Sequence, residues 1–458
     1  MTARRPRLAP AAALLLLAAI AFPPPATAAP AKPNIVFLVA DDLGTDLGVY
    51  GNPDVRTPNL DRFAAQGTRF ANAIAPAPVC APSRAGMFTG RHPIRVGAHL
   101  MRSRLAAPPR SLPEQLREAG YFVAWPNKID LNFDPPETFR DSAAHWTDRP
   151  LPREPFFLYL NLGEPHEGAL KNRRVQDDYL ATLGSAPRTD PAAIRLPPYY
   201  PDHPAIRADL ALHYDLIAAM DLRIGKILDQ LERAGVADRT LVLFVGDNGR
   251  PFPRAKRWLY DAGIHVPLIV RWPGVVPAAH TDTGLASLID LTPSLLDAAG
   301  IAPAKPLDGR ILFGPRTQPA PEFVFAARDR MDEVEDRSRA VRSDRFKYIL
   351  NERPEVPYAA PSAYADASAS LQILRSLHAS AKLSSPATDF FAPRKPAEEL
   401  YDLRTDPHEI HNLADDPAHA ATLERLREAL AQWRAGGDLG LTPEQDLLQS
   451  GHLLPFNP

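Results

Sequence analysis

Two pairs of polar residues stand directly after apolar runs of the chain. Asp41 and Asp42 follow residues 35–40, and Asp247 and Asn248 follow residues 240–246. Continuous apolar runs predict buried strands of a parallel sheet, and ligands bind beyond the carboxyl ends of such strands. Three carboxylates and an amide are hard oxygen ligands, which suit Ca²⁺ or Mg²⁺ far better than zinc. Either pair alone is more typical of a turn or helix cap, but together they favour a metal site.

The only cysteine of the 458 residues, Cys80, lies in the segment VCAPSRAGMFTG. Pro82 suits the first turn of a helix, where the missing N–H costs nothing. The start of that helix and the charge of Arg84 would attract an anion such as sulfate or phosphate. The simpler interpretation is a small buried cysteine and a solvent-facing arginine.

Strands and helices alternate through the first two thirds of the chain. Apolar runs at 155–162 and 266–271 predict further strands, and residues 57–66, 111–119 and 205–234 predict helices. This alternation predicts an α/β lobe whose mostly parallel mixed sheet is flanked by helices. From residue 323, FVFAARDR, RAVRSDRFKYIL and ELYDLRTDP predict a smaller α+β lobe with an antiparallel sheet. We expect residues 353–395, rich in Ala, Pro and Ser, to be a surface insertion.

The first residues have a basic start, a short apolar run broken by three prolines, and small residues near Ala28. This layout predicts a signal peptide at 1–28, and hence an exported protein, periplasmic or secreted, with no stable membrane span. We expect a catalytic domain at 29–322 and a C-terminal subdomain at 323–458. A net charge of −2 gives no reason to expect nucleic acid as a partner.

The segment from Cys80 to Arg84, continued by AGMFTGRHP, resembles the C-x-P-S-R signature of the sulfatase family, within the alkaline-phosphatase-like superfamily. PNIVFLVADDLG, FVGDNG and ELYDLRTDPHEIHNLA extend the resemblance over nearly the whole mature chain. The C-terminal lobe is similar to the bacterial branch related to heparan N-sulfatases (N-sulfoglucosamine sulfohydrolases). The resemblance implies that a maturation enzyme oxidises Cys80 to formylglycine, and that the protein hydrolyses sulfate esters or an N-sulfate of a sulfated carbohydrate.

The resemblance also implies a ligand set for Ca²⁺, with Mg²⁺ as the less favoured ion. The family's metal ligands fall on the two polar pairs and on the modified residue, that is, on Asp41, Asp42, Asp247, Asn248 and position 80. Arg84 matches the arginine that steadies the formylglycine.

Three further catalytic positions follow from the same resemblance. Lys128, in WPNKIDLNF, and Lys256, in RAKRWLY, match the lysines that hold the sulfate, and His166, in GEPHEG, matches the candidate general acid. Without the family context, the lysines would be solvated surface residues and the histidine an ordinary loop residue.

One position departs from the family pattern. The family has G-K-x-H where this chain has Asn127-Lys128-Ile129-Asp130, so a carboxylate replaces the expected histidine. Either Asp130 accepts a proton or orients Lys128, or another group such as His99 substitutes. His99 and Arg102 are also candidates for binding a polyanionic sugar, with a solvated basic loop as the alternative.

Two other functions remain open at the level of sequence. Phosphonate monoester hydrolases and phosphodiesterases share the superfamily, but the C-terminal segment ELYDLRTDPHEIHNLA favours a sulfatase. An inactive sugar-binding relative is supported by Asp130 alone. The presence of Cys80, Arg84 and both polar pairs argues against it.

Overall fold

The computed structural model describes residues 32–125, 128, 130–134 and 150–455, and residues from Lys32 onward form one compact unit. The predicted signal peptide, together with Asn127 and Ile129, lies outside the described residues. In the part of the chain that is described, no helix is both long enough and apolar enough to span a bilayer.

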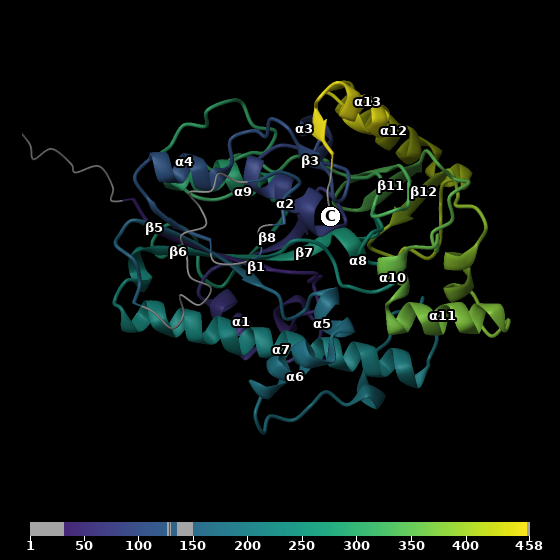
Figure 1. The fold of residues 1–458 in the computed structure, drawn as a ribbon, viewed down its shortest axis with the longest axis horizontal. Coiled ribbons are helices and arrows are strands. Elements are labelled where there is room, and N and C mark those ends of the chain that lie inside the picture. Colours follow the sequence, from purple (N-terminus) through teal and green to yellow (C-terminus); the bar gives the residue numbers. More distant parts are fainter. Residues whose placement is uncertain (1–31, 126–127, 129, 135–149, 456–458) are drawn as a thin grey trace, which may run out of the picture. The chain divides into compact units, whose positions relative to one another are not determined.

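A seven-stranded mixed sheet forms the centre of the fold (Figure 1). Its strands in spatial order are β4 (Phe122–Ala124), β5 (Phe156–Leu162), β1 (Asn34–Ala40), β6 (Thr240–Gly246), β7 (His265–Arg271), β2 (Thr68–Ile74) and β8 (His280–Ser287). β1 runs parallel to both β5 and β6, while β7 runs antiparallel to β6 and β2. The predicted mostly parallel sheet is therefore confirmed, and it places the carboxyl ends of β1 and β6 side by side.

Helices cover both faces of this sheet, which is why its central strands β1 and β6 are continuous apolar runs. Figure 1 shows α2 (Cys80–Thr89), α4 (Leu112–Glu118) and α9 (Leu291–Ala298) on one face, and α1 (Pro58–Ala65) and α7 (Pro204–Arg233) on the other. Alternate residues of β1 separate the two cores. Phe37 and Val39 pack toward α2, whereas Leu38 packs toward α7, as the two-residue period of a strand requires.

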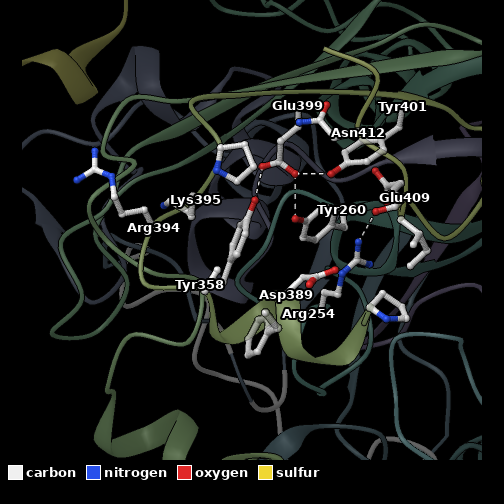
Figure 2. Close-up of a pocket in the computed structure, with 15 residues that line it drawn as sticks. Arg254, Tyr260, Tyr358, Asp389, Arg394, Lys395, Glu399, Tyr401, Glu409 and Asn412 are labelled. Carbon is white, nitrogen blue, oxygen red and sulfur yellow. Dashed lines mark hydrogen bonds between the residues drawn. The ribbon is translucent and has the colours of Figure 1, made fainter. Parts of the chain in front are cut away.

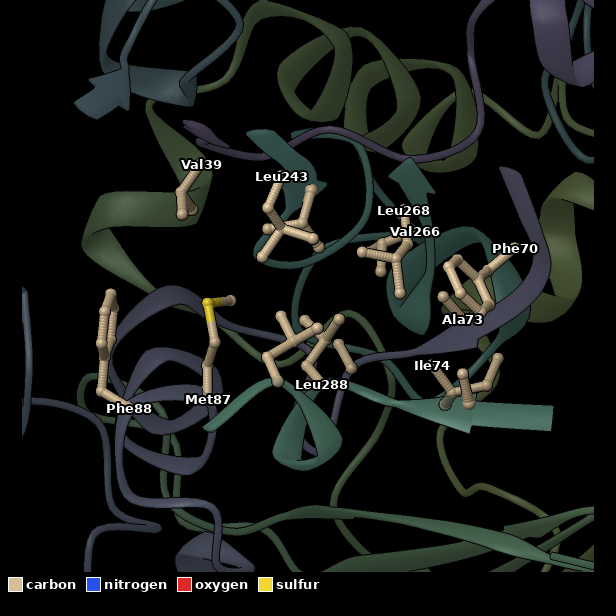
Figure 3. Close-up of a cluster of buried hydrophobic side chains, with 14 of the residues drawn as sticks. Val39, Phe70, Ala73, Ile74, Met87, Phe88, Leu243, Val266, Leu268 and Leu288 are labelled. Atoms are coloured by element: carbon tan, nitrogen blue, oxygen red, sulfur yellow. The ribbon is translucent and has the colours of Figure 1, made fainter. Parts of the chain in front are cut away.

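The core beneath α2 fixes the helix that carries Cys80. Met87 and Phe88 of α2 lie in one buried cluster with Val39 of β1 and Leu243 of β6 (Figure 3). Gly90 ends the helix in the left-handed conformation, with φ of 66°. Because Phe88 is fully buried, truncating it to Ala should cost about 3–5 kcal/mol. Packing on the apolar side of α2 thus holds its first turn at the edge of the sheet.

A separate four-stranded antiparallel sheet has the order β12 (Glu398–Asp402), β11 (Phe346–Asn351), β10 (Ser338–Arg342) and β9 (Val324–Arg328). Helix α12 (Ala420–Ala435) packs on it through Leu426, Leu430 and Trp433. This confirms the antiparallel C-terminal sheet that the sequence predicts.

The remaining elements are short. The helices are α3 (Pro93–Val96), α5 (Glu167–Lys171), α6 (Arg173–Ala181), α8 (Asp261–Ile264), α10 (Ala363–Asp366), α11 (Ala369–Ala379) and α13 (Glu444–Gln449). β3 (Arg104–Leu105) pairs with β13 (Leu453–Leu454). Single 3₁₀ turns span Gly48–Tyr50, Pro191–Ala193, Ala237–Arg239, Leu288–Asp290, Ala387–Phe391, Pro417–His419 and Leu439–Leu441.

Residues 353–395 differ from the expected surface insertion. Leu371 and Leu374 of α11 are buried, and α11 lies beside the long helix α7 (Figure 1). Phe390 is buried as well and joins the core cluster on the α2 face. The Ala, Pro and Ser content of the segment obscured these few apolar anchors, which attach it to both cores.

Candidate active site

The two polar pairs meet where β1 and β6 end. The backbone N–H of Asp42 donates to Oδ1 of Asp247 at 2.9 Å, and Nδ2 of Asn248 donates to Oδ1 of Asp42 at 3.0 Å. All four residues are at most 1% exposed. Asp42 has a φ of 55°, a left-handed conformation that turns the chain sharply after the strand. The sheet topology therefore brings together two dipeptides that lie about 200 positions apart in the sequence.

Cys80 is the first residue of α2 and only 2% exposed. Its Sγ lies 3.9 Å from Oδ1 of Asp42. One ligand atom from each of Asp41, Asp42, Cys80 and His166 can be chosen so that all four lie within 4.8 Å of one another. Burial raises the pKa of the Cys80 thiol well above its usual value, so the unmodified side chain is a neutral thiol.

Arg84 points into the protein, away from solvent. Its Nε donates to Oδ2 of Asp247 at 2.7 Å, and its Nη2 lies 3.1 Å from Oδ1 of Asp41. Asn161 and Tyr159 of β5 accept its remaining bonds. Arg84 therefore joins the two polar pairs, and the solvent-facing alternative is wrong because its side chain is fully buried.

Burial and the neighbouring charges shift the pKa values of Asp41 and Asp247 in opposite directions. Burial would raise the pKa of Asp41, but Arg84 and Lys128 hold it well below its usual value. Burial raises the pKa of Asp247 to about 7, since the carboxylates of Asp41 and Asp42 add to the effect and offset part of the attraction of Arg84. The raised pKa of Asp247 indicates that Arg84 does not fully offset the burial and mutual repulsion of the three carboxylates.

Both predicted lysines reach this cluster. Nζ of Lys128 lies 2.8 Å from Oδ2 of Asp41 and 3.1 Å from Oδ2 of Asp130. Nζ of Lys256 lies 2.8 Å from Oδ1 of Asp42 and 2.5 Å from Oε1 of Glu167. Burial would lower the pKa of each lysine, but the surrounding acidic groups raise it above its usual value. Both lysines therefore remain cationic.

His166 caps the short helix α5. Its Nδ1 accepts a hydrogen bond from the N–H of Gly168 at 3.0 Å, and its Nε2 lies 3.8 Å from Oδ2 of Asp42. Burial lowers the pKa of His166, which favours the neutral ring. Because Nδ1 is an acceptor, the proton of that neutral ring sits on Nε2, on the side of the acidic cluster.

A cavity of about 260 Å³, here called the Cys80 pocket, opens over these groups. It is lined by six of the residues that the sequence singled out: Cys80, Arg102, Lys128, Asp130, His166 and Lys256. His99 is not one of its lining residues. It is buried beside Asp329 and Arg339, and burial lowers the pKa of its imidazole. Asp130 is the group that contacts Lys128 where the family has its histidine.

Four charged or aromatic residues that line the Cys80 pocket were not predicted from sequence: Glu167, Arg257, Asp332 and Tyr364. Glu167 and Arg257 are direct neighbours of predicted residues, so their charge next to His166 and Lys256 was the available signal. Asp332 and Tyr364 come from the C-terminal third of the chain. Only the tertiary fold brings them to the pocket.

The donor set fits a hard divalent cation. The buried Oδ1 of Asn248 has no hydrogen-bond partner among the described residues, while its Nδ2 is fully engaged. An orphaned amide oxygen beside three buried carboxylates is the arrangement that Ca²⁺ ligation would satisfy.

A second cavity, of about 400 Å³, lies in the C-terminal part of the fold (Figure 2). We call it the tyrosine pocket. Buried Glu399 accepts hydrogen bonds from the hydroxyls of Tyr260, Tyr358 and Tyr401 and from Nδ2 of Asn351. The guanidinium of Arg254 lies 3.9 Å from the centre of the Tyr260 ring, and Lys395 pairs with Asp336 at 2.5 Å. These buried charges already have protein partners.

Comparison with known proteins agrees with the fold. Residues 33–148 and 126–301 match the sulfatase family model, and residues 253–351 match the model for the C-terminal region of N-sulphoglucosamine sulphohydrolase. An ulvan-active sulfatase of Formosa agariphila is 34% identical over 92% of this chain and 78% of its own. Human N-sulphoglucosamine sulphohydrolase is 30% identical over 88% of this chain and 89% of its own.

Solved structures support the fold alone. A structure described as a complex with D-glucosamine-2-N,6-O-disulfate has a TM-score of 0.62 at 18% identity, covering 88% of this chain and 98% of the other. A phosphonate monoester hydrolase of Agrobacterium radiobacter has a TM-score of 0.59 at 19% identity, covering 93% and 100%. The fold is therefore alkaline-phosphatase-like, and it does not by itself separate the two activities.

The chain belongs to the sulfatase family, with a C-terminal region of the N-sulphoglucosamine sulphohydrolase type. It is accordingly a sulfuric ester hydrolase.

Proposed function

We propose that the protein is an exported sulfatase that removes a sulfate ester, or an N-sulfate, from a sulfated carbohydrate. It would use a formylglycine made from Cys80 and a bound Ca²⁺. The observation that carries this proposal is the position of Cys80, which starts a helix 3.9 Å from Asp42 and shares its pocket with Lys128 and Lys256. The names of the relatives, an ulvan-active sulfatase and an N-sulphoglucosamine sulphohydrolase, support a glycan substrate.

The modified residue and the cation would supply what the other side chains lack. A hydrated formylglycine at position 80 would provide an oxygen nucleophile for sulfur and a second hydroxyl whose loss of a proton allows sulfate to leave. Asp41, Asp42, Asp247 and Asn248 would hold the Ca²⁺, which as a Lewis acid would lower the pKa of that nucleophile and polarise the sulfate.

The remaining side chains act on the sulfate and the leaving group. Lys128 contacts Asp41 and Lys256 contacts Asp42, so two ammonium groups stand where charge develops on the sulfate oxygens. His166, with its proton held on Nε2, donates that proton to the departing oxygen or nitrogen of the sugar. Asp130 holds Lys128 in place through its 3.1 Å contact. Arg84 keeps the two polar pairs together.

Two further proposals come from sequence. Residues 1–28 direct export, and a formylglycine-generating enzyme acts on Cys80. A catalytic domain at 29–322 and a C-terminal subdomain at 323–458 divide the chain at the start of the antiparallel sheet, whose first strand, β9, begins at Val324.

The test is a comparison of anions at equal enzyme concentration. Protein co-expressed with a formylglycine-generating enzyme should hydrolyse 4-nitrophenyl sulfate with a higher kcat/KM than a phenylphosphonate monoester or bis-4-nitrophenyl phosphate. A preference for either phosphorus substrate would replace the proposal by a phosphonate hydrolase or phosphodiesterase. No turnover of any of the three, with residue 80 fully modified, would favour an inactive sugar-binding relative.

A second assay separates O-sulfate from N-sulfate. N-sulfoglucosamine and glucosamine 6-sulfate are incubated with the matured enzyme, and released sulfate is measured by ion chromatography. Turnover of N-sulfoglucosamine would show that the protein resembles the human relative in activity as well as in sequence. Turnover of glucosamine 6-sulfate alone would leave only the family assignment.

A further inference from the structure

One part of the Cys80 pocket is lined by Arg102, Arg257, Asp332 and Tyr364, which have no role in the proposed chemistry of the sulfate. Nε of Arg102 donates to Oδ1 of Asp332 at 2.7 Å, and Nε of Arg257 lies 3.8 Å from Oδ2 of the same carboxylate. Tyr364 of α10 lies near both arginines, with its ring centre 5.5 Å from the guanidinium of Arg102 and 5.7 Å from that of Arg257. Asp332 thus bridges two arginines beside an aromatic ring. We call these residues the Asp332 cluster.

Three members of this cluster have a left-handed backbone. Arg102 has a φ of 61°, Asp332 of 51° and Arg257 of 83°. A non-glycine residue in this region costs of the order of 1 kcal/mol, and such residues gather where the surrounding structure holds a functional geometry. Here they aim three charged side chains into a single cavity.

Arg257 offers a hydrogen-bond donor that the protein leaves unused. Its side chain is 10% exposed, and its Nη2 donates to Glu167 at 2.9 Å. Its buried Nε has no hydrogen-bond partner among the described residues. Since a buried unpaired donor costs about 1–3 kcal/mol, a ligand that accepts from it would be stabilised.

Charge decides which chemical group the cluster suits. Asp332 already faces both guanidinium groups, so the cluster presents alternating donors and acceptors instead of an unpaired cation. A neutral hydroxyl can donate to the carboxylate and accept from an arginine at the same time, whereas a second anion would be repelled by Asp332. The half-buried ring of Tyr364 adds an apolar surface next to these polar groups.

We propose that the Asp332 cluster binds ring hydroxyls of the sugar that carries the sulfate, and so determines which sulfated sugar is hydrolysed. This inference rests on the proposed function and deepens it. Asp332 accepts from one hydroxyl, and Arg102 and Arg257 donate to that oxygen or to its neighbour. The sulfate itself is held by Lys128 and Lys256, on the side of the acidic pairs.

The experiment compares a substrate with a sugar to one without. Asp332→Asn and Arg102→Ala are assayed on 4-nitrophenyl sulfate and on whichever of N-sulfoglucosamine and glucosamine 6-sulfate the wild-type enzyme turns over. Arg104→Ala is the matched control, because Arg104 is two residues away, similarly exposed and paired with Asp134 outside the pocket. Each cluster variant should lower kcat/KM for the sugar about 10- to 100-fold and change that for 4-nitrophenyl sulfate less than about twofold. The control should match wild type on both.

Three results would overturn the inference. An equal loss on both substrates would make the cluster structural, and no loss on either would remove it from binding. A KM for the sugar that rises steeply with salt in the wild type and not in Arg102→Ala would show recognition of a second anion. Failure of the wild type on all sulfates, with residue 80 modified, would instead overturn the proposed function. The 4-nitrophenyl sulfate assay thus separates the two failures.

Discussion

The two cavities differ in how their charges are balanced. In the tyrosine pocket, of about 400 Å³, buried Glu399 is satisfied by three tyrosine hydroxyls and an asparagine (Figure 2). The Cys80 pocket is smaller, at about 260 Å³, and it holds the orphaned Nε of Arg257 and adjoins the orphaned Oδ1 of Asn248. Among the described lining residues of the larger cavity, the one buried atom without a hydrogen bond, Oε1 of Glu409, lies 2.6 Å from Nζ of Lys347. The smaller cavity leaves a donor and an adjoining acceptor for a ligand. The unpaired atoms at the Cys80 pocket therefore distinguish it from the tyrosine pocket, although it is the smaller of the two cavities.

The largest expected effect comes from removing the nucleophile. Cys80→Ala should lower kcat for 4-nitrophenyl sulfate at least about 1,000-fold, because no other side chain of the Cys80 pocket can replace formylglycine. Thermal unfolding should remain close to that of wild type, since alanine fits the same buried helix start. Retention of more than a tenth of the activity would end the assignment of Cys80. The same assay on Glu399→Gln should show near wild-type kcat.

Chelation should produce the next largest effect. Dialysis of the matured enzyme against EGTA should abolish sulfate release and lower the melting temperature, because three buried carboxylates lose the cation that offsets their repulsion. Ca²⁺ should restore both properties at lower concentration than Mg²⁺, which tolerates an irregular oxygen site less well. Full activity and an unchanged melting temperature after exhaustive chelation would contradict the metal site. Among the described residues, the carboxylates that line the tyrosine pocket do not form a group whose ligand atoms lie within 4.8 Å of one another, so we expect no cation to be removed there.

Removing the charged side chain of one lysine should lower the activity less than chelation does. Lys256→Ala is expected to lower kcat/KM about 100- to 1,000-fold, as for other side chains that stabilise charge in a transition state. Lys226→Ala, at an exposed position of α7, is the matched control and should retain wild-type kinetics. If both substitutions have equal effects, Lys256 does not act on the sulfate.

A substitution in the tyrosine pocket should change the stability of the protein and leave its activity unchanged. In Glu399→Gln, an amide with one acceptor oxygen faces four donors, which should lower the free energy of unfolding by about 2 kcal/mol. Glu424→Gln, at an exposed position of α12, should change it by less than about 0.5 kcal/mol. Chemical denaturation of both variants checks this. A loss of kcat in folded Glu399→Gln would break the contrast between the two cavities.

The main sheet and part of the site followed from sequence because their signals are local. Continuous apolar runs predict buried parallel strands, and the polar residues after β1 and β6 meet because those strands are neighbours. Asp332 and Tyr364 carry no such signal, since their place in the Cys80 pocket depends on how the C-terminal segments pack. The burial of Arg84 could not be predicted for the same reason, because its partners Asn161 and Tyr159 lie on β5, far from it in the sequence. Composition likewise hid the buried residues of α11.

The most direct test is to measure the mass of the peptide that contains residue 80. The peptide is taken from protein that was co-expressed with a formylglycine-generating enzyme and secreted. The account predicts a peptide about 18 Da lighter than the cysteine form, in a fraction that rises with the specific activity on 4-nitrophenyl sulfate across preparations. An active enzyme whose residue 80 remains an unmodified cysteine would contradict it.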